Sequence, residues 1–525
     1  MTTFESQKPD SALAAVPAAS TIAPRASRDH AVDLVRAACL VVVVGLHVMM
    51  AGITVETEGL AITNSLDGHP IFAWSTWLVQ VMPLFFVMGG FSSLLAWRRQ
   101  RGRGVTGADY VRDRVARLAR PALLPLGLVG MTLAVLGLVG LPDAVLADVG
   151  FRIGQPLWFL AVYLGCSGLV PLMARLHERA PWVTLLSLLG AVMIVDTVAQ
   201  LTAQPLIGAL NLLFVWVFVQ QLGFCLADGW FEGGFGGCFG GRRRWMLGLA
   251  GLAAFGVLLF LTTVGGYSTD MYENLNPPTV AILVLAVGQT LLFAFLRPWL
   301  ARLAERETLA GLSGAINKNA MQIYLWHVPV IVLIAVVLVA SGAAFPEPLS
   351  EGWWQSRPPF LVAVALLLIP IVIAVGWLER RGEAQRRVAL HCGVAAQGHV
   401  SAHSSAAVAP IGPWMAALKV VLGIAGVMTL IVAGFTPAYG AAIGVTLLLL
   451  AVLLRAPRRR VVVDAAPEAA VAAAAAAAAA TPAAASAAAS ATSAAAAATA
   501  AVAAATPASP AASAQSVAYS PPQKS

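Results

Sequence analysis

Long apolar stretches separated by short polar ones run through most of the chain. Windows long enough to cross the hydrocarbon core of a membrane, about 17–25 residues each, recur about twelve times. They are expected at residues 33–53, 74–96, 120–140, 156–174, 182–201, 205–227, 246–265, 279–296, 319–341, 360–379, 414–434 and 436–454. Because a backbone in lipid must satisfy its own hydrogen bonds, such windows are helices. The pattern predicts an all-α integral membrane protein with about twelve transmembrane helices.

The polar segments between and beyond these windows divide the chain into five parts. The last two windows are joined by the short turn TPAYG and form a helical hairpin. The predicted parts are a disordered cytoplasmic lead (1–27), a transmembrane core (28–379), a cytoplasmic linker (380–412), the transmembrane hairpin (413–455) and a disordered tail rich in Ala, Pro, Ser and Thr (456–525).

Composition and charge agree with a membrane protein and indicate its orientation. Of the 525 residues, 59% are hydrophobic and only 11% are charged, and the mean hydropathy is +0.80. That is too apolar for a water-soluble globule, so the net charge of +8 does not indicate a nucleic-acid partner. All but Arg152 and Arg357 of the 33 basic residues fall in alternate segments, starting with the N-terminal one. The positive-inside rule then predicts cytoplasmic N- and C-termini in a multi-pass protein of the inner (plasma) membrane.

Cysteine and histidine spacing gives no metal site. The five cysteines, at 39, 166, 225, 238 and 392, show neither a disulfide framework nor metal-ligand spacing. His391, His399 and His403 lie close together beside Cys392, but they fall in a flexible Ala/Gly/Ser-rich linker. A metal site needs ordered ligands, so none is predicted there.

The stretch 28–50, RDHAVDLVRAACLVVVVGLHVMM, places Asp33, Arg36 and His47 in or against an apolar run. About three helical turns separate Arg36 from His47, so both lie on one face, about 16 Å apart along the axis. The guanidinium is then near the water surface and the imidazole near mid-bilayer. Ionisable groups at that depth usually face a cavity and mark function. The alternative is a histidine that only hydrogen-bonds a neighbouring helix.

A second basic group precedes the third span. Arg114, Arg117 and Arg120 are spaced by three on the segment DYVRDRVARLARP, with Arg112 beside them, and this spacing aligns side chains on one helical face. Guanidinium groups so arranged suit phosphate groups, because each offers a two-pronged hydrogen-bonding fork. The alternative is an anchor for anionic lipids that also sets the topology.

The ninth span, NKNAMQIYLWHVPVIVL, carries a second intramembrane histidine. Tyr324 and His327 are three residues apart and share a face. Counted from Asn319, His327 lies about 12 Å into the membrane, a depth similar to that of His47, so the two imidazoles are expected to share a cavity. The alternative is a packing histidine beside interfacial aromatic side chains.

Five motifs in order carry a family resemblance: RxxxxDxxR followed by His47, then PLFFVMGGF, RDRVARLARP, PLWFL and IYLWHVPV. Over roughly residues 28–379 the chain resembles the acyltransferase-3 family of multi-spanning bacterial acyltransferases. The family's arginine–histidine signature falls on Arg36 and His47. One departure is Gly89, before Gly90, where the family usually has a serine.

The resemblance implies ten core helices, acyl-CoA as the cytoplasmic donor and a hydroxyl acceptor, usually on a sugar or glycosylated product. It also implies that Arg36, Arg114 and Arg117 contact the donor's phosphates and that His47 is catalytic. The donor is expected to be acetyl-CoA, with no bound cofactor. The O-acetylated acceptor is expected to be a glycan such as an exported polysaccharide, a glycolipid or a secreted metabolite.

Acyl transfer to an alcohol needs a base that removes the alcohol's proton, groups that bind the anionic donor, and exclusion of the water that would hydrolyse the thioester. His47 is the expected base, either removing the acceptor's proton or attacking the thioester itself. Asp33 is expected to orient Arg36, one helical turn away. The residues expected to position the substrates are Tyr324, His327 and Trp158 of the PLWFL motif.

Two other functions are compatible with many spans and intramembrane charges. A secondary transporter would have two related halves and paired broken helices, and the two halves here share no visible similarity. A scaffold for polysaccharide export would tolerate loss of His47. Both alternatives predict that acyl-CoA is not consumed.

Overall fold

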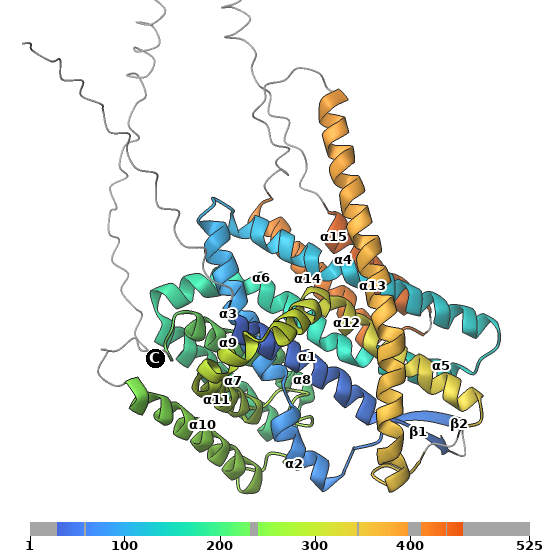
Figure 1. Cartoon of the computed structure of the whole chain (residues 1–525), viewed down its shortest axis with the longest axis horizontal. Coiled ribbons are helices and arrows are strands. Elements are labelled where there is room, and N and C mark those ends of the chain that lie inside the picture. Colours follow the sequence, from blue (N-terminus) through green and yellow to red (C-terminus); the bar gives the residue numbers. More distant parts are fainter. Residues whose placement is uncertain are drawn as a thin grey trace, which may run out of the picture. The chain divides into compact units, whose positions relative to one another are not determined.

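The computed structural model describes residues 29–56, 59–231, 240–343, 346–396, 411–436 and 438–454. The predicted lead and C-terminal tail lie outside these residues, as do 397–410 of the linker. Two strands, β1 (Ala51–Glu56) and β2 (Gly59–Asn64), pair antiparallel, and a 3-10 turn, η1 (Gln155–Leu157), precedes α6. The helices (Figure 1) are α1 (His30–Met50), α2 (Pro70–Val79), α3 (Met82–Arg101), α4 (Gly107–Leu138), α5 (Asp143–Gly154), α6 (Trp158–Arg179), α7 (Pro181–Thr202), α8 (Pro205–Gly208), α9 (Asn211–Ala227), α10 (Gly240–Thr263), α11 (Val280–Ala304), α12 (Glu307–Ala340), α13 (Glu351–Ala396), α14 (Pro413–Val432) and α15 (Ala438–Leu453).

Apart from residues 51–53, which belong to β1, the predicted apolar windows fall mainly on helix. In the described part of the chain, 11 helical segments are long and apolar enough to cross a membrane, and the shorter apolar helix α15 occupies the twelfth window. The prediction of an all-α multi-span membrane protein is confirmed. Three helices run well beyond their windows: α4 begins at Gly107, α12 begins at Glu307, and α13 continues to Ala396 through the first part of the predicted linker. The extensions of α4 and α13 are rich in Ala and Arg, which favour helix.

The second span is broken between α2 and α3. Pro83 lies in the first turn of α3, where its missing N–H leaves no hydrogen bond unmade. Gln80 occupies the break, and its side-chain oxygen accepts a hydrogen bond from the Met82 N–H at 3.3 Å. From α11, the Gln289 amide donates to the Gln80 carbonyl at 2.9 Å. Side chains therefore replace the backbone hydrogen bonds lost at the break, as a membrane interior requires.

Helices α3 and α9 approach each other through glycines. A Cβ atom on Gly223 of α9 would lie 2.2 Å from the Val87 carbonyl oxygen of α3, and one on Gly90 would lie 2.4 Å from the Gln220 carbonyl oxygen. Only residues without a Cβ allow backbones to come this close, which is the usual basis of tight helix pairs in membranes. The contact fixes α3 firmly against α9.

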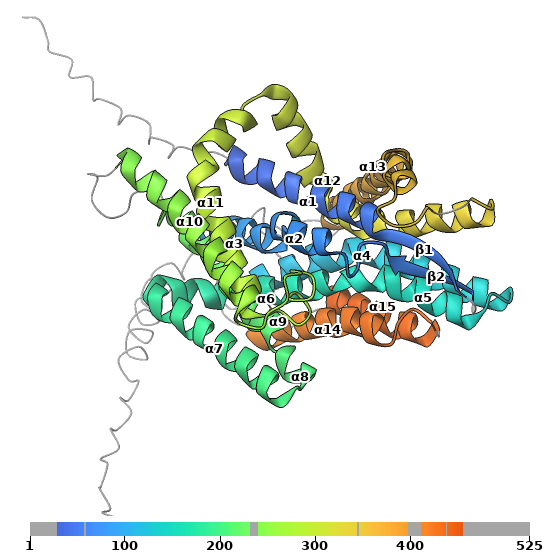
Figure 2. The same ribbon diagram turned by 90° about the horizontal axis from the view of Figure 1, so that it is seen from below.

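The hairpin of α14 and α15 packs against α4 and α6 (Figure 2). Its two helices meet at Gly426 and Gly444, where a Cβ on Gly426 would lie 2.7 Å from the Gly444 carbonyl oxygen. Lys419 of α14 is 2% exposed, and its ammonium donates to the carbonyls of Ala451 at 2.7 Å and Val452 at 3.2 Å. A cation at those C-terminal carbonyls satisfies them and complements the helix dipole.

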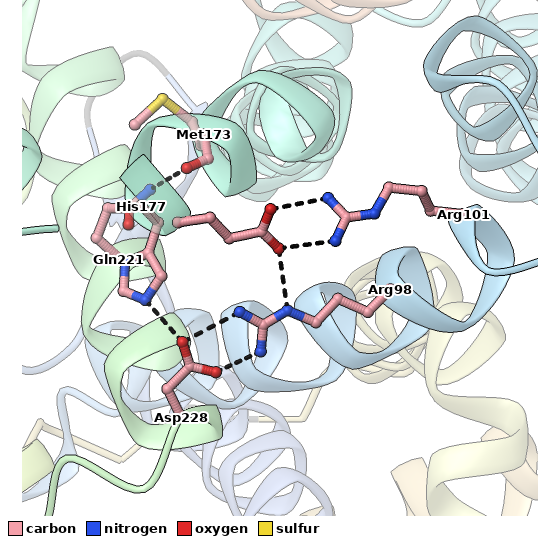
Figure 3. Close-up of polar contacts among 7 residues, drawn as sticks. Arg98, Arg101, Met173, His177, Gln221 and Asp228 are labelled. Atoms are coloured by element: carbon pink, nitrogen blue, oxygen red, sulfur yellow. Dashed lines mark hydrogen bonds and ion pairs between the residues drawn. The ribbon is translucent and has the colours of Figure 1, made fainter. Parts of the chain in front are cut away.

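An ion-pair network joins the ends of α3 and α6 to the turn after α9 (Figure 3). Arg98 donates to both carboxylate oxygens of Asp228 and, from Nε, to Glu178 at 3.2 Å. Arg101 binds Glu178 through two hydrogen bonds of 2.8 and 3.1 Å, and the buried His177 donates to Asp228 at 3.2 Å. Burial raises the pKa of Asp228, but the hydrogen bonds and charges of Arg98 and His177 outweigh burial and hold this pKa below its usual value.

Candidate active site

Two imidazoles from distant helices meet inside the bundle. His47 of α1 and His327 of α12 have ring centroids 4.9 Å apart and planes at 82°, an edge-to-face contact. His327 is fully buried, whereas His47 is partly exposed. His47 lies in the last turn of α1, and its depth near mid-bilayer stays a prediction. The two histidines that the sequence expected to share a cavity are direct neighbours.

Hydrogen bonds to backbone carbonyls fix the tautomer of both rings. Nδ1 of His47 donates to the Val43 carbonyl at 2.8 Å, and Nδ1 of His327 donates to the Tyr324 carbonyl at 2.7 Å. A carbonyl only accepts, so each Nδ1 carries the ring proton and each neutral Nε2 keeps a lone pair. The Nε2 atom of His327 is buried without a hydrogen-bond partner. The pair therefore offers two proton-accepting nitrogens at one place.

Tyr324 links this pair to the start of α6. Its ring centroid lies 6.2 Å from that of His327, and its hydroxyl donates to the Pro156 carbonyl at 2.9 Å. Pro156 belongs to the 3-10 turn that leads directly into Trp158, the first residue of α6. Of the three predicted positioning residues, His327 contacts His47 and Tyr324 contacts His327. Trp158 follows the 3-10 turn to which the Tyr324 hydroxyl is bound.

An aromatic cluster, Phe85, Phe86, Phe159, Tyr163 and Trp216, extends from Tyr324 toward α3 and α9. The Phe159 ring contacts Tyr324 at 5.0 Å and Phe85 at 5.4 Å between centroids. Tyr163 stacks on Phe159 at 5.5 Å, and Trp158 contacts Trp216 at 5.6 Å. Trp158 therefore reaches the same cluster from α6.

Arg36 lies at the other end of this cluster. Its guanidinium carbon lies 5.9 Å from the centroid of the Phe85 ring, a cation–π contact, and its Nε atom is buried without a hydrogen-bond partner. A continuous helix α1 joins Arg36 to His47, which puts them about 16 Å apart along the axis. The backbone carbonyl of Asp33 accepts a hydrogen bond from Asn317 of α12 at 2.6 Å. Orientation of Arg36 by the Asp33 carboxylate stays a prediction.

The arginines of α4 are positioned through Tyr110. Arg114 donates from Nε to the Tyr110 hydroxyl at 3.1 Å, and its guanidinium carbon lies 5.1 Å from the centre of that ring. Arg117 is exposed, one turn further along α4. The charge of Arg112 is paired with Asp109 at 2.7 Å and Asp113 at 2.9 Å. The geometry therefore leaves Arg114 with unused donor groups and Arg117 open to a ligand.

A family model described as an acyltransferase domain, that of the acyltransferase-3 family, matches residues 29–377, more than half of the chain. The chain belongs to this family. The predicted resemblance is confirmed, and the many apolar helices make the protein an acyltransferase of the multi-pass membrane type. The comparisons with curated proteins and with solved structures found no match.

The one departure from the family pattern has a structural counterpart in this acyltransferase. A Cβ atom on Gly89 would lie 3.3 Å from Cε2 of Tyr163 and 3.6 Å from its hydroxyl. A serine there would press on the Tyr163 ring, and the neighbouring side chain would have to move by a few tenths of an ångström. The absent hydroxyl is thus accompanied by a tyrosine packed against the glycine.

The aromatic cluster of the acyltransferase was missed by sequence reasoning. Its signals were the motifs PLFFVMGGF and PLWFL, which contain Phe85, Phe86 and Phe159, but adjacent aromatics in an apolar span do not show which face each one occupies. Within the described residues, no group of three or more His, Cys, Asp or Glu side chains is placed to hold a metal. The histidines of the linker, from His391 to His403, fall where no side chain is described.

Proposed function

We propose that the protein moves an acyl group, most simply acetyl, from cytoplasmic acyl-CoA to a hydroxyl of a glycan, glycolipid or secreted metabolite. The observation that carries this proposal is the contact of His47 with His327, in which both Nδ1 protons are held by carbonyls. An imidazole held with Nε2 free is suited to accept a hydroxyl proton near neutral pH. The positive-inside rule supports cytoplasmic termini and places the arginines of α4 on the cytoplasmic side of an inner membrane.

The donor would lie along the residues between Arg36 and the histidine pair. Acyl-CoA carries its phosphates at one end and its thioester at the end of a long, narrow, flexible arm. Arg36, with Arg114 and Arg117, would bind the phosphates as charge-assisted partners. The aromatic cluster supplies an apolar wall along which the arm extends to His47, about 16 Å from Arg36 along α1. Water is poorly accommodated along such a wall, which limits hydrolysis of the thioester.

The chemical step uses His47 as a general base. Its Nε2 takes the proton of the acceptor hydroxyl while the hydroxyl oxygen attacks the thioester carbonyl carbon. The new carbon–oxygen bond gives the ester, the carbon–sulfur bond breaks, and the thiolate leaves with the electron pair. The proton held by His47 then passes to the thiolate, which gives free CoA and restores the neutral imidazole.

The neighbours of His47 would position the acceptor. Nε2 of His327 is buried and unpartnered, so it would accept a hydrogen bond from the substrate and remove the penalty of an unsatisfied buried polar atom. Tyr324 holds its own carbonyl against Nδ1 of His327, which keeps that acceptor available. The indole of Trp158 would cover the donor arm beside the aromatic cluster.

The test is transfer of label from acetyl-CoA in membranes that contain wild type or His47→Ala at matched protein levels. A lipid and polysaccharide extract serves as the acceptor. His69→Ala is the matched control, because His69 precedes α2 without a side-chain capping bond. We expect the His47 variant to lose transfer and the control to keep it. Equal transfer by both variants would remove His47 from catalysis, and a labelled acyl-histidine trapped on the wild type would replace direct transfer with a covalent intermediate.

A further inference from the structure

A buried arginine contacts the end of the helix that carries His47. Arg357 of α13 is 6% exposed, and it is one of the two basic residues that the predicted topology leaves outside the cytoplasmic segments. No carboxylate pairs with it among the residues that the structure describes. Burying an arginine without a carboxylate partner costs folding free energy unless other oxygen atoms accept its hydrogen bonds.

Arg357 contacts the carbonyl oxygens of Val48, in the last turn of α1, and of Ala51, the residue that caps this helix. Nη1 of Arg357 donates to the Val48 carbonyl at 3.1 Å and to the Ala51 carbonyl at 2.9 Å. The last carbonyls of a helix have no partner within the helix and carry the negative end of its dipole. Arg357 thus supplies both the missing donors and the complementary charge at the C-terminus of α1.

Aromatic rings hold the guanidinium in this position. Its central carbon lies 4.8 Å from the centroid of the Trp353 ring and 5.4 Å from that of Phe360. Nε donates to the Ser356 hydroxyl at 3.2 Å. Trp353 is itself buried against Leu66 and Phe72, in a small apolar cluster that also contacts α1 through partly buried side chains near Met50. The arginine is therefore a rigid link between α13 and α1.

The same turn sets the orientation of His47. The imidazole donates to the Val43 carbonyl one turn earlier, and the His47 carbonyl accepts from the Ala51 N–H. Ala51 is thus bound at its N–H by His47 and at its carbonyl by Arg357. If this turn unwinds, the His47 backbone rotates and Nε2 no longer faces the substrate beside His327.

We propose that Arg357 is a positioning residue for His47, which acts by holding the C-terminal turn of α1 in its helical form. This inference rests on the proposed catalytic role of His47. It predicts that loss of Arg357 lowers turnover by misplacing the base, while the distant arginines that would bind the donor are unaffected. A misplacement of about 1 Å lowers rates on the order of 100-fold.

The experiment compares Arg357→Met and Arg357→Lys with wild type in one lipid environment. The matched control is Arg152→Met, which removes the other basic residue outside the cytoplasmic segments, paired with Asp148 at 3.6 Å. Two quantities are measured: amide hydrogen exchange of peptides covering residues 43–52, and kcat and KM for labelled acetyl-CoA with the lipid and polysaccharide extract as the acceptor.

We expect Arg357→Met to speed exchange of these amides about tenfold, from loss of charge-assisted hydrogen bonds, and to lower kcat with an unchanged KM for acetyl-CoA. Lysine, which keeps the charge but not the fork, should restore part of both. The control should match wild type. Unchanged exchange, or faster exchange with unchanged kcat, would overturn the proposal. Should Arg357→Met fail to fold, Arg357→Lys alone decides it by the same two readouts. Absence of turnover in wild type would instead refute the proposed function, and the exchange result would still decide whether Arg357 anchors α1.

Discussion

Replacing Gly223 by alanine is expected to push α3 and α9 apart. The added Cβ would lie 2.2 Å from the Val87 carbonyl oxygen and 2.7 Å from the Phe91 nitrogen. A carbon and a carbonyl oxygen in close contact are about 3.3 Å apart, so the helices would have to separate by about 1 Å at this point. Both obstructing atoms belong to backbone, so no side-chain rotation relieves the overlap.

The expected loss of stability follows from two opposing effects of Gly223→Ala. Overpacking that backbone movement must relieve costs about 3 kcal/mol, the upper part of the usual range. Alanine favours helix over glycine by about 1 kcal/mol. The net destabilisation is about 2 kcal/mol. With an unfolding entropy of about 2.1 cal/mol/K per residue, this lowers the apparent Tm of the 525-residue chain by about 2 °C.

The assay is thermal unfolding of purified protein in one detergent, followed by loss of the monodisperse peak. Gly127→Ala is the control, because a Cβ at this position in α4 meets nothing within 4 Å, so its apparent Tm should equal or exceed that of wild type. Since α3 also carries Phe85, Gly223→Ala should raise the KM for acyl-CoA as well. An apparent Tm for Gly223→Ala as high as that of the control would refute the close approach of α3 and α9.

Two further predictions concern the arginine that we place at the donor and the ion-pair network. Arg36→Met is expected to raise the KM for acyl-CoA about tenfold through loss of a charge-assisted contact, whereas replacing Arg179, an exposed arginine of α6, by methionine should change it little. Steady-state kinetics on both variants decide, and equal KM values would contradict the role of Arg36. The lowered pKa of Asp228 means that its ion pairs stabilise the fold above the ordinary carboxyl pKa, about 4, and that this contribution is lost as pH falls through the folded-state pKa. Apparent Tm of wild type should therefore fall more steeply than that of Asp228→Asn below about pH 4, and parallel curves would disprove it.

Hydropathy predicted the helices well because the bilayer leaves few alternatives. A chain segment in lipid satisfies its own backbone hydrogen bonds only as a helix or in a closed barrel, so window length sufficed to locate the spans. The contact of His47 with His327 was also predictable, since two costly groups at similar depth are expected to share a polar site. The positions of Arg36 and His47 on one helix followed from their spacing and the continuity of α1.

The packing between helices could not be obtained in this way. In a membrane helix the lipid-facing and buried sides are both apolar, so the pattern does not show that Phe159 faces Tyr324 or that Gly223 faces Val87. The contacts of Arg357 could not be predicted either. The positive-inside rule uses only the segment in which an arginine lies, and it does not indicate which backbone carbonyls the side chain contacts. The strands β1 and β2 were missed, and the first residues of β1, 51–53, fall inside an apolar window that predicted helix.

The hairpin of α14 and α15 restricts the side from which a molecule dissolved in the bilayer can enter the helix bundle. It covers α4 and α6, and a Cβ on Gly168 of α6 would already lie 2.8 Å from the Val420 side chain of α14. Lipids exchange quickly along an uncovered helix face, whereas a covalently attached hairpin stays in place. An acceptor dissolved in the bilayer therefore has no sideways entry between α4 and α6, and a lipid-linked acceptor would have to reach His47 from another side of the bundle.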